Sequence, residues 1–361
     1  MKTINWGFLG TGYAASQFAQ GLTILPDAKL LAVGSRNIET AKNFSRQFNV
    51  PRKYASYEEL VMDKDINIVY IATPNLQHKE NCILCLEAGK PVLCEKPFTL
   101  NAKEAREVIE LARHKGLFCM EAMWMRFIPL IQKIPDILSE GVIGEVKMFS
   151  ADFGIRVKFD ENDRRFNPDL GGGALLDMGI YPISLAFYLF GSPSNIVSQC
   201  SFGKVDEQST IIFRYPNKQL AVLSSSLLTN TPSEVLIMGT KGLLRIHAPI
   251  YRPSQLSISH FSQKRPDSSI TKRGWKSSLK KISAVRNVYE NFLSPFLNQP
   301  SKQIISYKGN GYNYEAAEAM KCLRNGECET QIMPLDETFN ILETLDTIRN
   351  QWNNQRALGS S

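Results

Sequence analysis

The sequence predicts a two-domain α/β protein. A doubly wound parallel sheet is expected over residues 1–123, and an α+β domain with a large, mostly antiparallel open sheet over residues 124–361. Up to about residue 123, short apolar strand-like runs alternate with helical segments, as in a parallel sheet covered by helices. After Gly144, long alternating runs follow one another, several at hairpin-length gaps, which is typical of antiparallel strands. The length of 361 residues is sufficient for both domains.

Composition places the chain among ordinary globular proteins, with 43% apolar and 21% charged residues. No continuous apolar run approaches the ~20 residues that span a bilayer, and the first residues run into a strand without the apolar block of a signal peptide. Most of the seven cysteines lie in apolar segments, and we expect reduced thiols. Cys82 and Cys85 are interpreted as buried small residues rather than a redox or zinc site. We therefore expect a cytoplasmic protein with no membrane span and no metal.

The first strand, expected from Thr3 to Leu9, leads directly into the letters G-T-G-Y-A-A. In this G-x-G-x-x-A pattern, the two glycines permit a tight turn and the close approach of a pyrophosphate, and the third small residue permits helix-on-strand packing. The helix expected from about Tyr13 to Leu25 offers its first N–H groups to the phosphates. The pattern predicts a Rossmann dinucleotide-binding loop made of Gly10, Thr11, Gly12, Tyr13 and Ala14.

The second strand, Lys29 to Val33, ends in G-S-R, where NAD-binding proteins usually place an acidic residue for the ribose hydroxyls. Ser35 and Arg36 stand there instead. A guanidinium and a hydroxyl bind a 2′-phosphate, which a carboxylate would repel. The pair predicts NADP as the preferred cofactor, with NAD as the other possibility.

Two helices, around 38–48 and 57–62, lead to the strand I-N-I-V-Y-I-A-T. Thr73, Pro74 and Asn75 end this strand at the carboxyl edge of the sheet, beside the expected cofactor. His78 lies in the first turn of a helix expected over 76–88. We interpret it as a residue near the cofactor rather than as a catalytic base.

The apolar run from Pro91 to Cys94 is expected to be the next strand, and it ends in E-K-P. Glu and Lys are rarely buried without partners, and an open α/β sheet keeps its ligand at the carboxyl ends of its strands. The local residues also fit the solvated start of a loop, but the neighbouring loops favour a site at Lys96. Glu95 is expected to be structural or to face the cofactor. A helix over 101–115 and a strand over 117–123 complete the first domain.

A helix from Phe127 to Glu140 is expected to cross into the second domain. The segment R-R-F-N-P-D-L-G-G-G-A-L-L-D-M-G-I-Y interrupts the strands there, and a helix is expected to begin near Ala174. Asp177 and Tyr181 are four residues apart, so they lie on one helical face and can address one site. An ordinary helix with an acid and a packed tyrosine is the alternative. The expected strands are 146–155, 195–202, 209–215, 220–227, 234–239 and 242–247.

With G-T-G-Y-A-A, E-K-P and E-A-M-W-M-R-F, the chain resembles the glucose–fructose oxidoreductase/inositol dehydrogenase/rhizopine catabolism (Gfo/Idh/MocA) family. The resemblance implies that Lys96 lies by the nicotinamide and the reacting hydroxyl. The D-x-x-x-Y motif is similar to that of dimeric dihydrodiol dehydrogenases and NADP-dependent xylose dehydrogenases, whereas inositol dehydrogenases have histidine. The resemblance continues to Y-N-Y-E-A near Tyr314 and the final helix 335–352, which is free to pack back on the first domain. It implies a homo-oligomer, a dimer or tetramer, formed through the open face of the second sheet.

Residues 255–308 fall outside the resemblance and are expected to be an insertion of this chain. Between Lys264 and Arg286, eight basic residues and one acidic residue account for the whole net charge of +7. The rest is balanced, so the chain does not look like a nucleic-acid binder. Apolar residues at helical spacing predict an amphipathic basic helix, which either covers the sheet with a solvated cationic face or docks an anionic ligand or membrane surface. These apolar residues are Trp275, Leu279, Ile282, Val285, Val288 and Phe292.

The expected reaction is hydride transfer between the nicotinamide and a hydroxyl or ketone of a small-molecule substrate, a sugar or a cyclic diol. Tyrosine titrates near ~10, and a nearby ammonium lowers its pKa. We expect Tyr181 to accept the proton in oxidation and donate it in reduction, and Lys96 to hold the substrate oxygen and tune Tyr181. Asp177 is expected to orient Lys96 or a substrate hydroxyl, and Trp124 and Arg126 to wall the substrate pocket. Two other functions remain open: reduction of a keto group on a nucleotide-linked sugar, and a non-catalytic NADP-binding regulator.

Overall fold

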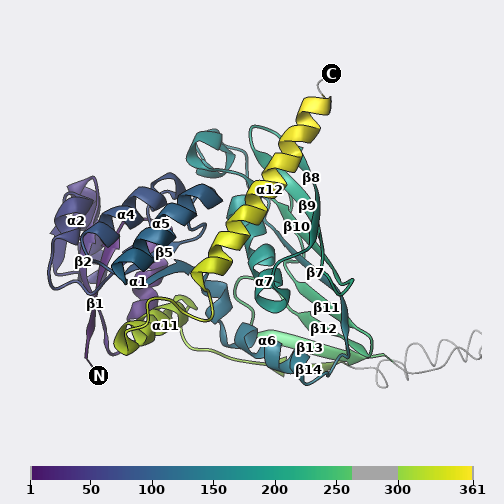
Figure 1. Ribbon diagram of the computed structural model, residues 1–361. Helices are drawn as coiled ribbons and strands as arrows, with labels where there is room; N and C mark the ends of the chain where they lie inside the picture. The colour runs from purple at the N-terminus through teal and green to yellow at the C-terminus, as the bar shows by residue number, and fades with distance from the viewer. Residues whose placement is uncertain (1, 262–299, 360–361) are drawn as a thin grey trace, which may run out of the picture.

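The computed structural model describes residues 2–261 and 300–359, which fold around two sheets that lie side by side (Figure 1). The first sheet has six strands in the order β3-β2-β1-β4-β5-β6, and the second has eight in the order β14-β13-β12-β11-β7-β10-β9-β8. Helix α12 (Leu335–Gly359), yellow in Figure 1, packs against elements of both parts.

Every strand pair of the first sheet is parallel, which confirms the predicted doubly wound sheet. The chain moves from β1 outward to β2 and β3 and then returns to β4 on the other side of β1. An open α/β sheet binds its ligand at the carboxyl ends of the strands beside such a reversal. Strand β3 was not predicted, because three residues are too few to show a strand period. The strands are β1 (Ile4–Leu9), β2 (Ala28–Gly34), β3 (Arg52–Tyr54), β4 (Ile68–Ile71), β5 (Val92–Glu95) and β6 (Cys119–Ala122).

The helices of this part begin and end close to the predicted positions. Asn37, Ser56 and Asn101 each accept a hydrogen bond from a backbone N–H of the first helical turn, which satisfies one of its free donors. Gly116 ends the last of these helices in the left-handed conformation. The helices are α1 (Tyr13–Leu22), α2 (Ile38–Phe48), α3 (Tyr57–Val61), η1 (Asn75–Gln77), α4 (His78–Glu87) and α5 (Ala102–Lys115).

The second sheet is mostly antiparallel, as predicted, and only β7 and β10 pair in parallel within the described residues. Helices α7 (Ile180–Phe190) and α12 lie on one face of it (Figure 1). Buried and exposed side chains alternate along β9, with Ile211 and Phe213 buried and Ile212 exposed between them. The strands are β7 (Val146–Gly154), β8 (Asn195–Phe202), β9 (Asp206–Arg214), β10 (Leu220–Ser226), β11 (Val235–Gly239), β12 (Gly242–Ile246), β13 (Gln255–His260) and β14 (Ser301–Ile304).

Residues 255–308, which were expected to be an insertion of this chain, contribute a strand to the second sheet at each end. Strands β13 and β14 extend the sheet beyond β12. β14 is exposed along its whole length, so its sequence carries no alternating apolar pattern that would mark it as a strand. The predicted basic helix and its eight cations lie in 262–299, outside the described residues.

Residues 168–190 form the helical segment at the centre of the second part. It comprises η4 (Pro168–Leu170), the π-helix η5 (Leu175–Gly179) and α7. Its length and hydropathy would suffice for a membrane span, contrary to the expectation from sequence, but 78% of its apolar window is buried inside the protein. The segment is therefore the core helix of this domain. The continuous helix within this segment begins near Ala174, as predicted, although its first part, η5, is π-helical.

The remaining helices connect the two parts. The α12 residues Asp346 and Arg349 reach the loop before α5: Asp346 accepts a hydrogen bond from the Ala102 N–H at 2.9 Å, and Arg349 donates to the Leu100 carbonyl at 2.6 Å. The loop before α7 also packs on the first part, because a Cβ added at Gly171 would lie 2.7 Å from Leu100. The other elements are η2 (Trp124–Phe127), α6 (Pro129–Ser139), η3 (Arg164–Phe166) and α11 (Tyr312–Asn325).

The start of the π-helix depends on Gly173 and Asp206. Asp206 accepts a hydrogen bond from the Leu175 N–H at 2.7 Å, and burial raises the pKa of its carboxyl to about 7. Gly173 has φ +120°, and a Cβ there would lie 2.1 Å from the Asp206 carboxylate. Only glycine fits this position without displacing the carboxylate that caps the helix.

Gly173→Ala is therefore expected to lower the free energy of unfolding by about 3 kcal/mol, the sum of a left-handed backbone cost and an overpacking cost. Gly89→Ala is the matched control, because Gly89 also has a positive φ, +73°, but no described atom lies within 4 Å of its added Cβ. It should cost about 1 kcal/mol. Denaturant unfolding of both variants measures the difference, and equal losses would contradict this account of the helix start.

Candidate active site

A cleft of about 840 Å³ opens at the carboxyl end of the first sheet, and residues of both parts line it. All predicted site residues except Arg126 are among its lining. From the first part these are Gly10, Thr11, Gly12, Tyr13, Ala14, Ser35, Arg36, Thr73, Pro74, Asn75, His78, Glu95 and Lys96; the others are Trp124, Asp177 and Tyr181. Residues distant in sequence thus converge on one cavity.

The glycine loop has the geometry that a pyrophosphate requires. Gly10 has φ +101°, and a Cβ there would lie 2.5 Å from the Ala72 carbonyl oxygen. At Gly12, the N-cap of α1, no described atom lies within 4 Å of an added Cβ, and no side chain caps the helix. The first N–H groups of α1 therefore face open space at the cleft, where a side chain would block the approach of a phosphate.

The far end of the cleft, beyond β2, has a cationic and hydroxyl-rich lining. Ser35 is buried, and its Oγ lies 2.6 Å from the Thr40 Oγ1. Arg36 interacts with the Tyr57 hydroxyl. Burial raises the pKa of Tyr57, and the Arg36 guanidinium opposes that rise. The acidic residues among the described lining are Glu95 and Asp177, and both belong to other loops. This end therefore fits a 2′-phosphate.

His78 joins the loop after β4 to the E-K-P loop. It is fully buried, with Nδ1 2.8 Å from the Pro97 carbonyl oxygen and Nε2 2.9 Å from the Thr73 carbonyl oxygen. Burial lowers the pKa of His78, against the opposing effect of these two carbonyls. Both ring nitrogens are engaged by the backbone, so His78 positions the two loops and does not offer a free nitrogen to a substrate.

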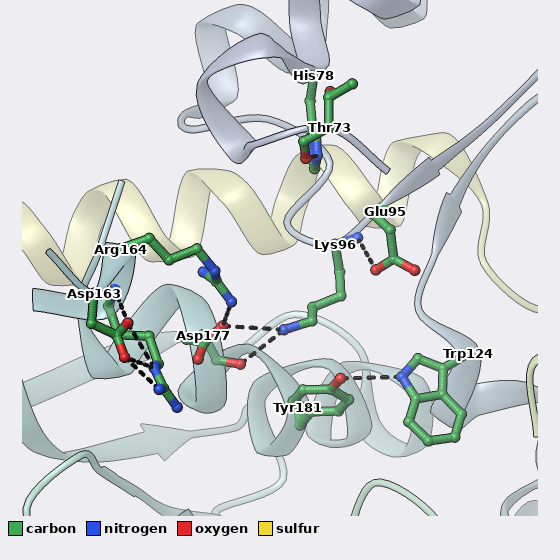
Figure 2. A network of polar contacts seen from close by, with 10 residues as sticks. Thr73, His78, Glu95, Lys96, Trp124, Asp163, Arg164, Asp177 and Tyr181 are labelled. Atoms are coloured by element: carbon green, nitrogen blue, oxygen red, sulfur yellow. Dashed lines mark hydrogen bonds and ion pairs between the residues drawn. The ribbon is translucent and has the colours of Figure 1, made fainter. Parts of the chain in front are cut away.

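Lys96 is the residue around which the site is arranged (Figure 2). Its Nζ donates a hydrogen bond to the Asp177 carbonyl oxygen at 2.9 Å and lies 3.7 Å from the Asp177 Oδ1. The same Nζ lies 4.8 Å from the centre of the Tyr181 ring. Burial alone would lower the pKa of Lys96, but Tyr181, Asp177 and Glu95 raise it overall. The side chain is therefore an ammonium at neutral pH.

Asp177 is held as a carboxylate by two cations. Arg164, from η3, donates to its Oδ1 at 2.8 Å, the same oxygen that the Lys96 ammonium approaches (Figure 2). Burial would raise the pKa of Asp177, but Lys96 and Arg164 lower it overall. The side chain of Arg164 is 49% exposed, so its guanidinium remains accessible from the cleft. Arg164 was not predicted as a site residue, although the R-R-F run was noted.

The Tyr181 hydroxyl accepts a hydrogen bond from the Trp124 indole N–H at 3.1 Å (Figure 2). Burial raises the pKa of Tyr181, and Lys96 and Trp124 oppose this rise without cancelling it. The expected lowering by Lys96 is present, but the net direction is the opposite of the expectation. Sequence cannot show how completely a ring is buried. Because its pKa is raised, Tyr181 is a neutral phenol that can donate a proton.

Aromatic rings surround the Tyr181 hydroxyl. Trp124 stacks on Tyr312 at 4.7 Å between ring centres, and Phe153 meets Tyr181 edge-on at 5.4 Å. Tyr251 lies 5.2 Å from Phe153 and 5.9 Å from Trp124. Phe153, Tyr251 and Tyr312 were not predicted, because nothing in their local sequence indicates contacts that form only across the fold. They give the end of the cleft around Tyr181 a wide apolar wall.

Arg126 does not line the cleft, and its expected role as a pocket wall is wrong. Its side chain is fully buried, donates to the Ser184 Oγ at 2.8 Å and to the Ser184 carbonyl oxygen at 2.7 Å, and pairs with Glu337. It therefore joins η2 to α7 and α12. Three segments far apart in sequence enclose this arginine, which its position beside Trp124 could not indicate.

Two family models match the chain, and together they cover most of it. The oxidoreductase family with an NAD-binding Rossmann fold matches residues 4–123, and the GFO/IDH/MocA C-terminal domain matches residues 131–245.

Individual relatives match along nearly their whole length. The trans-1,2-dihydrobenzene-1,2-diol dehydrogenase of Xenopus tropicalis is 32% identical over 347 residues, which are 94% of this chain and 96% of that protein. Among solved structures, a 3-ketoreductase from Actinomadura kijaniata in complex with NADP and TDP-benzene has a TM-score of 0.79 at 24% identity, covering 97% of this chain and 98% of that one. A levoglucosan dehydrogenase in complex with NADH has a TM-score of 0.79 at 20% identity, covering 97% and 96%.

Proposed function

Because the chain belongs to the GFO/IDH/MocA oxidoreductase family, we propose that it is an NADP-dependent dehydrogenase or reductase. It transfers a hydride between the nicotinamide and a CH–OH or keto group of a sugar or cyclic diol. One observation carries the proposal: Lys96 of the first part and Tyr181 of the second meet in one cleft beside a dinucleotide-binding loop. All seven cysteines are free and lie in buried or half-buried positions, which fits a reducing cytoplasm.

The lining residues divide by the part of the dinucleotide they would hold. The loop from Gly10 to Gly12 and the start of α1 suit the pyrophosphate. Ser35 and Arg36 suit the 2′-phosphate, and the edge made by Thr73 and Glu95 suits the nicotinamide end. The bound cofactor would supply or accept the hydride, and the protein would orient the substrate and move its proton.

Tyr181 and Lys96 divide the proton chemistry between them. In reduction, the neutral Tyr181 hydroxyl donates its proton to the substrate oxygen as negative charge develops there, while the Lys96 ammonium stabilises that charge. In oxidation, Tyr181 accepts the proton, and Lys96 stabilises the phenolate. Asp177 anchors the Lys96 ammonium through its carbonyl oxygen and carboxylate. Trp124 fixes the Tyr181 hydroxyl by donating to it.

Arg36→Ala is expected to weaken NADP binding by about 10- to 100-fold, because a charge-assisted hydrogen bond contributes about 1.5–3 kcal/mol. NAD lacks the 2′-phosphate, so its dissociation constant should change by less than about 2-fold. Arg46→Ala is the control, because Arg46 is an exposed residue of helix α2, which follows Arg36 in the sequence. Calorimetric titration with both cofactors measures the effect, and equal losses for NADP and NAD would exclude Arg36 as the phosphate ligand.

The apolar wall and Asp177 favour a ring with adjacent hydroxyls as the substrate. A screen of aldoses, cyclic diols and keto-sugars, following the absorbance of the reduced nicotinamide, tests this. Reduction of a nucleotide-linked keto-sugar is the second candidate, because three arginines, Arg164, Arg165 and Arg252, also line the cleft. Turnover restricted to nucleotide-linked sugars would favour the second candidate. Cofactor binding without turnover of any of these compounds would favour a regulator.

We further propose that the chain forms a homo-oligomer through the outer face of the second sheet. Exposed apolar side chains gather on strands of this sheet: Met148 is 39% exposed, Val197 55%, Ile212 40% and Leu220 41%. Val197 and Ile212 are direct cross-strand partners. An apolar patch of this kind marks an interaction site more often than a solvated face.

Ile212→Lys is expected to convert the oligomer to a monomer, because a charge at the centre of an apolar interface is left without a partner. The measurement is molar mass by light scattering after size exclusion. Met62→Lys, at a 73% exposed position outside this sheet, is the control and should leave the mass unchanged. A wild-type protein that is monomeric at high concentration would contradict the proposal.

A further inference from the structure

The cleft lining between Phe153 and Arg252 is rich in guanidinium groups and poor in carboxylates and carboxamides. It contains three arginines, Arg164, Arg165 and Arg252, and one acid, Asp177, but no asparagine or glutamine. A guanidinium only donates hydrogen bonds, whereas each hydroxyl of a neutral sugar both donates and accepts. The proton chemistry proposed above uses Asp177 and gives the three arginines no role.

Arg165 is already satisfied by Asp163, two residues before it. Its Nε donates to both carboxylate oxygens of Asp163, at 3.0 and 3.1 Å, and its Nη2 donates to one of them. A guanidinium fork on a carboxylate is a strong and geometrically specific contact. The pair is held against the glycine run, because the Gly173 N–H donates to the Arg165 carbonyl oxygen at 2.9 Å. Arg165 therefore helps to build the wall of the cleft.

Arg164 is engaged at only one end of its guanidinium. Its Nη2 donates to the Asp177 Oδ1 at 2.8 Å, and its side chain makes no other hydrogen bond among the described residues. The side chain is 49% exposed and lines the cleft. Its backbone is tightly packed, because a Cβ added at Gly172 would lie 2.5 Å from the Arg164 carbonyl oxygen. The remaining N–H donors of a well-positioned arginine are therefore available to a ligand in the cleft.

Arg252 is a second cation available in the cleft. Its side chain forms no ion pair or hydrogen bond within the described part of the chain, and the residue is exposed. Its backbone is fixed, because its N–H donates to the Pro249 carbonyl oxygen at 3.0 Å and its carbonyl oxygen accepts from the Tyr307 hydroxyl at 3.3 Å. The preceding residue, Tyr251, has its ring centre 6.4 Å from that of Tyr181. Arg252 therefore follows directly on the apolar wall around the catalytic hydroxyl.

Positive charges exceed negative ones at this end of the cleft. Lys96 and Arg164 share the single carboxylate of Asp177 (Figure 2), and Arg252 pairs with no described carboxylate. Glu95, the other acid of the lining, is a buried residue of β5 in the first sheet. Carboxylates and phosphates only accept hydrogen bonds, and guanidinium groups bind both with matching geometry. An anionic ligand therefore complements this lining better than a neutral one.

We propose that Arg164 and Arg252 bind an anionic group carried by the substrate, a carboxylate or a phosphate. The inference rests on the proposed function and deepens it, because the reacting carbon of the same substrate would lie at Lys96 and Tyr181. The substrate class is then a hydroxy or keto sugar with an acidic group: a sugar acid, a sugar phosphate or a nucleotide-linked sugar. The two arginines select the substrate and take no part in the proton transfer.

The test is calorimetric titration of the protein saturated with NADP⁺, so that the phosphates of the cofactor already occupy their own sites. The probes are D-glucose, D-glucuronate, D-glucose 6-phosphate and UDP-glucose, which share one type of sugar ring and differ in the anionic group. At least one of the three anionic probes should bind about 10-fold more tightly than glucose, or better. The tightest of them identifies whether a carboxylate, a phosphate or a diphosphate is bound. Affinities that all stay within about 10-fold of that for glucose would overturn the inference.

Substitution of the two arginines makes the result specific. Arg164→Gln and Arg252→Gln should each weaken the binding of the tightest anionic probe by about 10- to 100-fold, and should change the affinities for glucose and NADP⁺ by less than about 2-fold. Arg164→Lys keeps the charge without the planar fork and should recover part of the lost affinity. Lys158→Gln is the matched control, because it removes an exposed positive charge between β7 and η3 outside the cleft lining.

The alternatives give different results. Equal losses for glucose and the anionic probe in Arg164→Gln would mean that Arg164 only holds Asp177 in place. A loss of NADP⁺ affinity in the glutamine variants would make the arginines cofactor ligands. Either result would overturn this inference and leave the proposed function standing. A wild-type protein that does not bind NADP⁺ would overturn the proposed function and this inference with it.

Discussion

Tyr181→Phe is expected to lower kcat by about 100- to 10,000-fold, the range that general acid–base catalysis contributes. The phenyl ring can keep the edge-on contact with Phe153 and the position under Lys96. Only the hydroxyl that donates or accepts the proton is removed. The dissociation constant of NADP should therefore change by less than about 2-fold, because the phosphate-binding loops are untouched.

Tyr188→Phe is the matched control for this substitution. Tyr188 lies on the same helix, α7, but packs against the guanidinium of Arg126 at 5.4 Å and does not line the cleft. It should retain nearly full kcat. Steady-state rates and calorimetric binding of both variants decide the matter: near-normal turnover in Tyr181→Phe would remove Tyr181 from the proton chemistry.

Lys96→Met is expected to lower kcat/KM by about 100- to 1,000-fold. The change removes the ammonium that stabilises charge on the substrate oxygen, and losses of one such group commonly cost about 100- to 1,000-fold. It also leaves Asp177 with Arg164 as its remaining cation. The methionine has a similar length and apolar stem, so folding is expected to survive.

The pH dependence of Lys96→Met gives a separate readout. The Lys96 ammonium lowers the pKa of Tyr181, but burial has the larger effect, so the pKa is raised overall. Its removal therefore raises the pKa of Tyr181 further, and the alkaline rise of the oxidation rate should move to higher pH. The rate of the reduction direction should lose its alkaline fall over the same range. A pH profile identical to that of the wild type would show that Lys96 does not tune Tyr181.

The parts of the site that sequence predicted are those whose chemistry is local. The glycine loop needs a strand before it and a helix after it, and Gly10 and Gly12 lie where the turn and the open helix start require them. Lys96 and Tyr181 come from short motifs at the end of a strand and on one helical turn. The prediction that Lys96 and Tyr181 meet in one site depended on the family resemblance, because no local pattern specifies that two domains meet.

The parts that sequence did not predict depend on burial and long-range packing. Arg126 follows Trp124 by two residues, yet Ser184 and Glu337 enclose the arginine while the tryptophan faces the cleft. The net pKa direction of Tyr181 follows from its burial, which no spacing reveals.

The central claim is that Lys96 and Tyr181 meet over the same nicotinamide ring. A crystal structure of the protein with bound NADP tests it most directly. We predict that the pyrophosphate lies at the start of α1. The reacting carbon of the nicotinamide should face the Tyr181 hydroxyl across a gap that admits one substrate carbon. That substrate carbon would lie about 3.5 Å from both the nicotinamide carbon and the hydroxyl. A nicotinamide bound outside this cleft, or turned so that its reacting carbon faces away from both side chains, would contradict the account.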